Sequence, residues 1–176
     1  MAKVLYSAAM SLDGFIAGPG GDMSWLTEHA GTVDPAEADR LLQATGALLV
    51  GNRTHRGDDP NKGTDAEGPF GGRYHGAVVV LTHNPPAEPE PGVVYSTDLH
   101  EAVELAKKAA GEKYVNVLGA DVARQCLAAG LLDEIAMFVV PALLGDGVPV
   151  FRHPGGTHVR LEHMPGMAAH WYRVVG

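Results

Sequence analysis

Three short segments place hydrogen-bond donors or cations directly after an apolar run, where a strand-to-helix crossing would present them to a ligand. The first is Gly51-Asn52-Arg53-Thr54, which follows the run Ala47–Val50. A glycine lets the backbone approach a ligand, an arginine pairs well with phosphate, and a helix beginning near Arg53 would direct free N–H groups at an anion. The segment indicates a phosphate site, with an ordinary turn and a solvated arginine as the alternative.

Two further segments repeat this arrangement. Gly119-Ala120-Asp121 follows the run Tyr114–Leu118, and Thr82-His83 follows Ala77–Leu81. Asp121 is predicted to cap the next helix, and the glycine spacing is not that of a Rossmann fingerprint. Thr82 and His83 would meet a phosphate or an adenine edge, or else only close the end of the strand. Three such segments at one edge of a parallel sheet favour an extended ligand that carries phosphate.

The runs that precede these segments are predicted strands of one sheet. Continuous apolar runs are typical of strands covered on both faces, and helices alternate with them along the chain. The predicted strands are Val4–Leu12, Ala47–Val50, Ala77–Leu81, Tyr114–Leu118 and Ile135–Val140, followed by an antiparallel edge hairpin of His158–His163 and Ala168–Val175. We therefore predict an α/β fold with a central, mostly parallel sheet and helices on both faces.

Three helices are predicted from the signals at their ends. Asp34 followed by Pro35 and Glu37, and Asp98 followed by Glu101, are typical capping sequences. The predicted helices run from Asp34 to about Thr45, from Asp98 to Gly111, and from Asp121 to Ala129.

Composition narrows the class of protein. The chain has 176 residues, Lys+Arg 13 and Asp+Glu 21, for a net charge of −8. An acidic chain without a basic run is not expected to bind nucleic acid or anionic membranes non-specifically. No apolar run reaches the roughly 18 residues that span a bilayer, and the N-terminus does not resemble a signal peptide. We expect one domain over residues 1–176 in a cytoplasmic protein.

Several reactive side chains have ordinary structural explanations. Cys126 is the single cysteine, which excludes an internal disulfide framework. It is predicted to be a small buried apolar residue. Asp13 precedes Gly14 and is predicted to be a turn residue. The histidines do not have the spacing of a metal site, so no metal is expected.

Taken in order, the motifs resemble the dihydrofolate-reductase-like family, specifically the reductase domain of the riboflavin-pathway deaminase–reductase. The resemblance covers the chain from Lys3 to Val175. It rests on six segments, which are Ala9–Ala17, Gly20–Trp25, Gly51–Thr54, Asp58–Pro60, Ala129–Ile135 and Val140–Phe151.

The resemblance implies NADPH binding and hydride transfer to a substrate. By position, it places Ala9, Ile16 and Trp25 beside the nicotinamide and Leu81, Thr82 and His83 near the adenosine and its 2′-phosphate. It also implies that the diphosphate lies among Gly51, Asn52, Arg53, Thr54, Leu118, Gly119, Ala120, Asp121 and Val122, with Asp58 near the cofactor. The glycine-rich segment 18–25 would be a mobile lid, and the family counterpart of Ile135–Val140 sits at a dimer contact, so a homodimer is expected.

Two departures from the riboflavin-pathway pattern concern the substrate. Leu118 stands where those enzymes carry a glutamate, and Asn61–Thr64 stands where they carry a phosphate-binding arginine. We therefore predict an NADPH-dependent reductase of another small polar substrate, such as a carbonyl, an imine or a conjugated C=N.

Three alternatives remain open. The first is a non-catalytic NADP- or nucleotide-binding protein of the same fold, and the second is a flavin-binding protein. The third is a dihydrofolate reductase, whose family places a carboxylate on the first helix. Asp34 is the candidate catalytic acid at that place, although its predicted capping role explains it as well.

Overall fold

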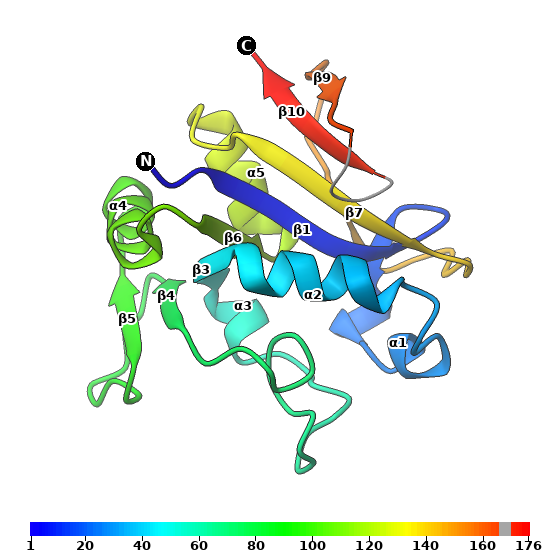
Figure 1. Ribbon diagram of the computed structural model, residues 1–176, viewed down its shortest axis with the longest axis horizontal. Helices are drawn as coiled ribbons and strands as arrows, with labels where there is room; N and C mark the ends of the chain where they lie inside the picture. The colour runs from blue at the N-terminus through cyan, green and yellow to red at the C-terminus, as the bar shows by residue number, and fades with distance from the viewer. Residues whose placement is uncertain (166–169) are drawn as a thin grey trace.

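The computed structural model describes residues 1–165 and 170–176, and its centre is an eight-stranded sheet of order β5-β4-β3-β6-β1-β7-β10-β9 (Figure 1). The first six strands in this order are parallel, whereas β10 and β9 form an antiparallel edge. The strands are β1 Val4–Ser11, β3 Thr45–Gly51, β4 Ala77–Leu81, β5 Val93–Ser96, β6 Tyr114–Leu118, β7 Glu134–Val140, β9 Arg160–His163 and β10 Trp171–Val175. A separate two-stranded ribbon consists of β2 Phe15–Ala17 and β8 Val148–Pro149. The predicted mostly parallel sheet with an antiparallel edge hairpin is confirmed.

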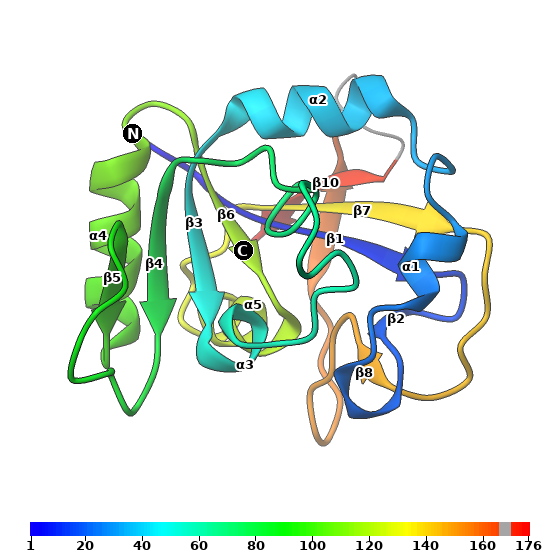
Figure 2. The same ribbon diagram turned by 90° about the horizontal axis from the view of Figure 1, so that it is seen from below.

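Helices cover both faces of the sheet (Figures 1 and 2). The long helices are α2 Pro35–Ala44, α4 Leu99–Ala110 and α5 Ala120–Ala128, and the short ones are η1 Pro19–Gly21, α1 Trp25–Glu28 and α3 Asn52–His55. In β1, Val4 and Tyr6 pack into the core cluster that contains α4 and α5, while Leu5 between them packs toward Leu41 of α2. Because side chains alternate along a strand, α2 lies on the opposite face from α4 and α5.

The helices begin where their capping residues predict. The carboxylate of Asp34 accepts a hydrogen bond from the Ala36 amide at 2.9 Å, and that of Asp98 accepts one from the Glu101 amide at 2.8 Å. Gly111 ends α4 with φ +65°, a conformation that glycine adopts without strain. Local sequence therefore fixes the ends of α2 and α4.

The hairpin is shorter than predicted. The first strand begins at Arg160 rather than His158, and the second is described from Trp171 onward. Ala168 and Ala169, also predicted to be strand residues, lie outside the described residues. All four residues of β9 are exposed, so few side-chain contacts hold the start of this strand to the core.

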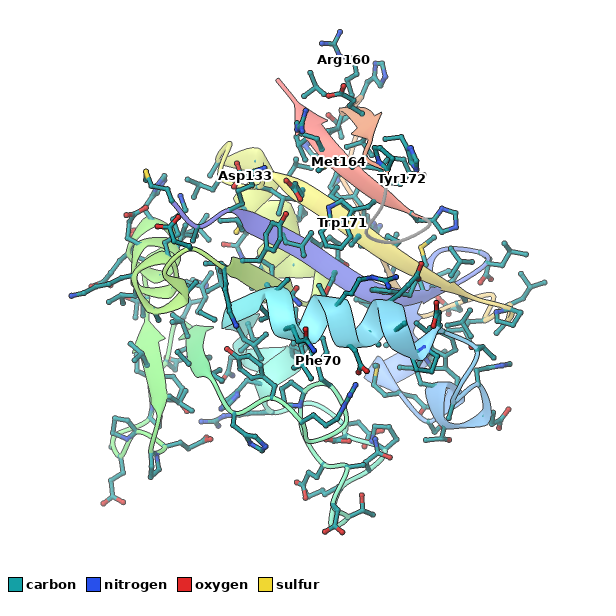
Figure 3. All side chains as sticks on the ribbon, viewed as in Figure 1. Phe70, Asp133, Arg160, Met164, Trp171 and Tyr172 are labelled. Carbon is teal, nitrogen blue, oxygen red and sulfur yellow. The ribbon has the colours of Figure 1, made fainter. Side chains whose placement is uncertain are left out.

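A carboxylate at the start of β7 is buried with three hydrogen-bond donors. Lys3 Nζ donates to Glu134 at 2.8 Å, Tyr114 Oη at 2.9 Å and Trp171 Nε1 at 2.8 Å. Glu134 is fully buried, which by itself raises its pKa, but the three donors outweigh burial and hold the pKa of this carboxyl below its ordinary range. Figure 3 shows Trp171 among the side chains on the ribbon.

Two single-residue predictions are confirmed. Cys126 is fully buried on α5. The Asp13 carboxylate accepts hydrogen bonds from Ser11 Oγ and from the amides of Leu144 and Gly145, and so ties the end of β1 to the loop after β7. Among the helices described, none is long and apolar enough to cross a membrane.

Candidate functional site

The crossings after β3 and β6 meet at one edge of the sheet. The two strands are parallel neighbours, and Val50 pairs with Leu118 at their ends. A Cβ atom added to Gly119 would lie 2.3 Å from Thr54 Oγ1, and one added to Gly51 would lie 3.0 Å from Val122 Cγ2. Each crossing therefore needs a glycine where the other approaches it, and Figure 2 shows α3 and α5 side by side there.

The helix α5 begins without a side-chain cap. We predicted that Asp121 would be this cap, and the prediction is wrong, because Gly119 precedes the helix and Asp121 lies inside its first turn. Gly119 has φ +102°, which turns the chain into the helix two residues before Asp121. The Asp121 carboxylate instead accepts hydrogen bonds from Arg124 and Gln125, both at 2.9 Å. Since no side chain caps α5, its first N–H groups are available to a ligand.

The charge at this edge is mixed. Arg53 and Arg56 are exposed on and just after α3. The pKa of Asp121 is lowered mainly by the Arg124 hydrogen bond, and the charge of Arg53 adds to this effect. Arg53 directly precedes Thr54, which lies against Gly119 at the start of α5. A cation from one crossing thus lies beside the free N–H groups of the other, an arrangement suited to an anion.

Two predicted site residues hold buried polar atoms without partners. Among the described residues, Asn52 Oδ1 and Trp25 Nε1 are the buried side-chain nitrogen or oxygen atoms that form no hydrogen bond. An unpaired buried polar group is costly, and such groups concentrate where a ligand or a rearrangement can supply the partner. Asn52 begins α3 directly after Gly51, and Trp25 begins α1.

The crossing after β4 continues the same edge. Leu81 pairs with Gly51, so the end of β4 lies next to the end of β3. His83 is exposed, whereas Thr82 is 93% buried and its Oγ1 accepts a hydrogen bond from the Asn84 amide at 3.2 Å. The structure therefore places three of the predicted crossings in one row, with the Thr82 hydroxyl partly used by its own turn.

A cluster that sequence analysis missed joins α3 to the outer strand. Glu90 accepts hydrogen bonds from Tyr95 Oη at 3.1 Å and lies 3.2 Å from His55 Nε2, and the His55 and Tyr95 rings meet edge to face. These contacts lower the pKa of Glu90, with the His55 hydrogen bond as the largest cause. The run Val93–Tyr95, with two β-branched residues and an aromatic one, was the signal for this strand.

The remaining predicted residues are more scattered. Ala9 lies near the end of β1 and Ile16 in β2, both half-buried. The Asp34 carboxylate is exposed and serves as the cap of α2. Asp58 is exposed, and it is the neighbouring Asp59 that orders the following loop by accepting hydrogen bonds from the amides of residues 61 and 68.

The residues at this edge fit the diphosphate of a dinucleotide. The uncapped amides of α5 supply donors, the exposed Arg53 supplies charge, and Gly51 and Gly119 allow close backbone approach. Among the described residues, no three His, Cys, Asp or Glu side chains are grouped so as to hold a metal ion.

Comparison with known proteins identifies the family of the chain and solved structures with a similar fold. The family model of the RibD C-terminal domain matches residues 2–168. The uncharacterised protein YwjB of Bacillus subtilis (strain 168) is 28% identical over 164 residues, which are 91% of this chain and 89% of YwjB. A solved structure from Shewanella sp. PV-4, provisionally described as a riboflavin biosynthesis protein, has a TM-score of 0.66 at 22% identity. The match covers 99% of this chain and 97% of the Shewanella chain. The riboflavin biosynthesis reductase Rib7 of Saccharomyces cerevisiae has a TM-score of 0.60 at 20% identity, over 99% of this chain and 90% of its own. These likenesses establish the dihydrofolate-reductase-like fold.

Proposed function

Because the chain belongs to the RibD C-terminal domain family, we propose that it is an NADPH-dependent reductase of a small polar substrate. The observation that carries the proposal is the meeting of the two glycine crossings, after β3 and β6, beside an uncapped helix and an exposed arginine. The reductase descriptions of related structures support the reaction class.

The diphosphate would be held between the two crossings. The first amides of α5 would donate to one phosphate and Arg53 would add a charged contact, since α5 begins where Thr54, the neighbour of Arg53, approaches Gly119. Gly51 and Gly119 leave room for this approach, because either Cβ atom would press on the opposite crossing.

The adenosine end would lie along the crossing after β4. His83 is exposed there, and Arg56 directly follows α3. These two basic side chains lie outside the two crossings that would hold the diphosphate. We expect them to favour the 2′-phosphate of NADPH over the free ribose of NADH, because a phosphate adds charge-assisted hydrogen bonds.

The nicotinamide end would lie at the end of β1. Ala9 has a small side chain that would let a flat ring approach the sheet, and Ile16 and Trp25 would exclude water from this end of the site. Bound NADPH supplies the hydride. The chain's own task is to hold the acceptor beside it, and Asp34 is the candidate acid, although its carboxylate also caps α2.

The substrate is proposed to differ from the riboflavin intermediate. Leu118 replaces the expected glutamate, and its side chain packs against the apolar cluster of Leu48, Val50 and Val80. A leucine at this place offers no charge to a polar substrate, so recognition must use other groups of this edge.

Ligand-dependent thermal stability tests the proposal. The purified chain is titrated with NADPH, NADH or FMN, and a ligand at 100 times its Kd is expected to stabilise by about 2.7 kcal/mol. Stabilisation by NADPH well above that by NADH supports the proposed site, and stabilisation by FMN alone refutes it. NADPH oxidation is then followed with a panel of carbonyl and imine substrates and with dihydrofolate. NADPH binding without turnover of any of them would favour the non-catalytic alternative, to which the replaced substrate residues point.

A further inference from the structure

The nicotinamide end of the proposed site lies on the face of the sheet that α2 covers. Leu5 packs toward Leu41 of α2, and Ala9 points the same way because alternate residues of β1 share a face. Leu118 lies on this face as well, since Asn116, two residues before it, is paired with Leu5. Burial decreases toward the carboxyl ends of the strands, from Leu5, which is fully buried, to Ala9 and Leu118, which are half-buried. That end of the face is therefore accessible to a ligand.

Phe70 packs onto this face from the segment between α3 and β4. It packs against two apolar clusters, one containing Leu5 and Leu41 and the other containing Val50, and Figure 3 shows it beside α2. Leu118 packs against the second cluster too. The Phe70 side chain is half-buried, so part of it stays at the surface on the same cluster as Leu118, the residue that replaces the expected glutamate.

The backbone at Phe70 is strained. Its φ is +58°, and in the part of the chain that the structure describes it is the one non-glycine residue with a positive φ. Positions 68, 71 and 72 also have positive φ, and all three are glycines. A glycine at position 70 would remove the strain, so the aromatic ring has to contribute something that offsets it. Strain of this kind concentrates at ligand sites.

Hydrogen bonds hold the ring against α2. Arg73 Nη1 donates to the Asp39 carboxylate of α2 at 2.5 Å, and Arg73 Nε donates to Phe70 O at 3.2 Å. Tyr74 Oη donates to Ala77 O at 3.0 Å, and the centroids of the Tyr74 and Phe70 rings are 6.2 Å apart. Because the ring is in place before a ligand arrives, less entropy is lost when one binds.

The charges of the same segment oppose an anionic substrate. Residues 57–76 contain four carboxylates and two cations, which are those of Asp58, Asp59, Asp65 and Glu67 and those of Lys62 and Arg73. Arg73 is already paired with Asp39. A phosphate or carboxylate on the substrate would meet this excess of negative charge, whereas an uncharged group would not.

We propose that Phe70 determines substrate specificity, and that the substrate is an uncharged carbonyl compound with a flat apolar body, such as an aromatic aldehyde. This inference rests on the proposed reductase function and narrows its substrate class. The body of the substrate would lie on Phe70 and Leu118, with the carbonyl carbon toward Ala9. That carbon gains the hydride, the π electrons of the C=O bond move to the oxygen, and the oxygen takes a proton from water. The aldehyde becomes an alcohol, and NADPH becomes NADP⁺.

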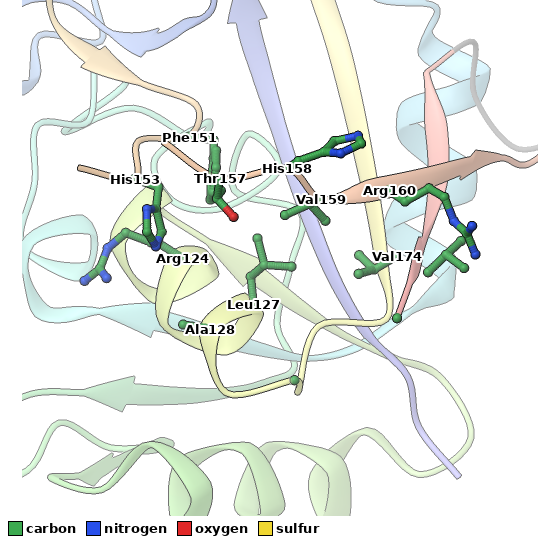
Figure 4. A pocket seen from close by; sticks show the side chains of 13 residues that line it. Arg124, Leu127, Ala128, Phe151, His153, Thr157, His158, Val159, Arg160 and Val174 are labelled. Carbon is green, nitrogen blue, oxygen red and sulfur yellow. The ribbon is translucent and has the colours of Figure 1, made fainter. Parts of the chain in front are cut away.

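A second apolar surface, on the opposite face of the sheet, provides the control. Phe151, Leu127 of α5 and Val174 of β10 line a groove of about 610 Å³, shown in Figure 4. Phe151 is 39% exposed. An aromatic compound that bound to any exposed apolar surface would bind there as well, so Phe151→Leu is the matched control for Phe70→Leu.

Three aldehydes test the substrate class by their rates of NADPH oxidation. Benzaldehyde is flat and uncharged, para-carboxybenzaldehyde adds a charge, and cyclohexanecarbaldehyde is uncharged but not flat. We expect kcat/KM for benzaldehyde to exceed that for the carboxylate at least about tenfold, because a charge against apolar side chains is costly. It should exceed that for the cyclohexane compound roughly two- to tenfold, the scale of an aromatic contact. Equal values, or a preference for the carboxylate, overturn the substrate class.

The Phe70→Leu variant tests the residue, because it keeps an apolar side chain and removes the ring. We expect KM for benzaldehyde to rise roughly two- to tenfold while NADPH affinity stays the same. Phe70→Gly, which also relieves the backbone strain, should raise KM at least as much, and Phe151→Leu should leave it unchanged. A ring that served only packing would change the urea midpoint and not KM, and that result overturns the role of Phe70.

Benzamide separates this inference from the reductase proposal, because it has the ring but no reducible aldehyde. Its binding to the NADPH-saturated chain is measured by ligand-observed NMR, and Phe70→Leu should weaken it whereas Phe151→Leu should not. No NADPH oxidation with any aldehyde refutes the reductase and with it the substrate. Turnover of benzaldehyde together with benzamide binding that is insensitive to Phe70→Leu overturns the role of Phe70 alone.

Discussion

Replacing Gly119 with alanine tests the contact between the two crossings most directly. Gly119 has φ +102°, where a side chain is strained, and the new Cβ would lie 2.3 Å from Thr54 Oγ1. Strain of this kind costs about 1–3 kcal/mol, and the overlap with Thr54 adds to it. We therefore expect Gly119→Ala to lower the free energy of unfolding by roughly 2–4 kcal/mol.

Gly130, at the other end of the α5 segment, provides the matched control. It also has positive φ, +69°, but a Cβ atom there meets nothing within 4 Å. Gly130→Ala should therefore show the backbone cost of about 1 kcal/mol without the overlap. The double variant Gly119→Ala/Thr54→Ala should recover the part of the loss that is due to overlap, because the Thr54 hydroxyl is gone.

Urea unfolding measures the stability changes, and calorimetric titration at a temperature where every variant is folded measures NADPH binding. The start of α5 has to move away from α3 to accept the alanine, so we expect Gly119→Ala to bind NADPH at least about tenfold more weakly than Gly130→Ala, the loss of roughly one hydrogen bond. If both variants bound NADPH as tightly as the wild type, the two crossings could not hold the diphosphate.

Three further outcomes are expected. Arg53→Ala should weaken NADPH binding by about 1.5–3 kcal/mol, the scale of a charged hydrogen bond, whereas Arg40→Ala on α2 should not change it; equal titration curves would remove Arg53 from the site. Glu134→Gln should cost about 1–3 kcal/mol at neutral pH. Since the pKa of Glu134 is lowered on folding, its contribution is full above the ordinary carboxyl value near 4.5 and is lost as the pH falls through the folded value, so urea unfolding of this variant should vary less with pH below 5 than that of the wild type. Asp13→Ala should speed hydrogen exchange at the amides that its carboxylate holds, those of residues 144 and 145, while Asp22→Ala should leave both rates unchanged.

The parts of the fold that could be predicted are those with strong local signals. Continuous apolar runs mark β3, β4 and β6, and the capping carboxylates of Asp34 and Asp98 mark the starts of α2 and α4. The strand β5 was missed because it has four residues and follows a proline-rich stretch, so it is stabilised chiefly by its pairing with β4. The ribbon of β2 and β8 depends in the same way on a partner far away in the sequence.

The candidate site shows a similar division. Glycine, arginine and threonine after an apolar run could be recognised locally, but the sequence alone does not show that Thr54 lies where a side chain at position 119 would stand. The conformation of Gly119 explains why the predicted cap of α5 is wrong. Gly119 starts the helix earlier by turning the chain with positive φ, and Asp121 is then carried into the first turn, where its carboxylate pairs with Arg124.

The absence of a capping carboxylate on α5 has a consequence for the choice of ligand. An aspartate at the cap would accept a hydrogen bond from a first-turn amide, as the Asp34 carboxylate does from the Ala36 amide at the start of α2, and its negative charge would oppose an anion there. At α5 the acid is paired along the helix with Arg124 and Gln125 instead, so the amides stay free and Arg53 adds a positive charge beside them. The same chain thus closes one helix start with a carboxylate and leaves another open, and the open one is where the glycine crossings meet.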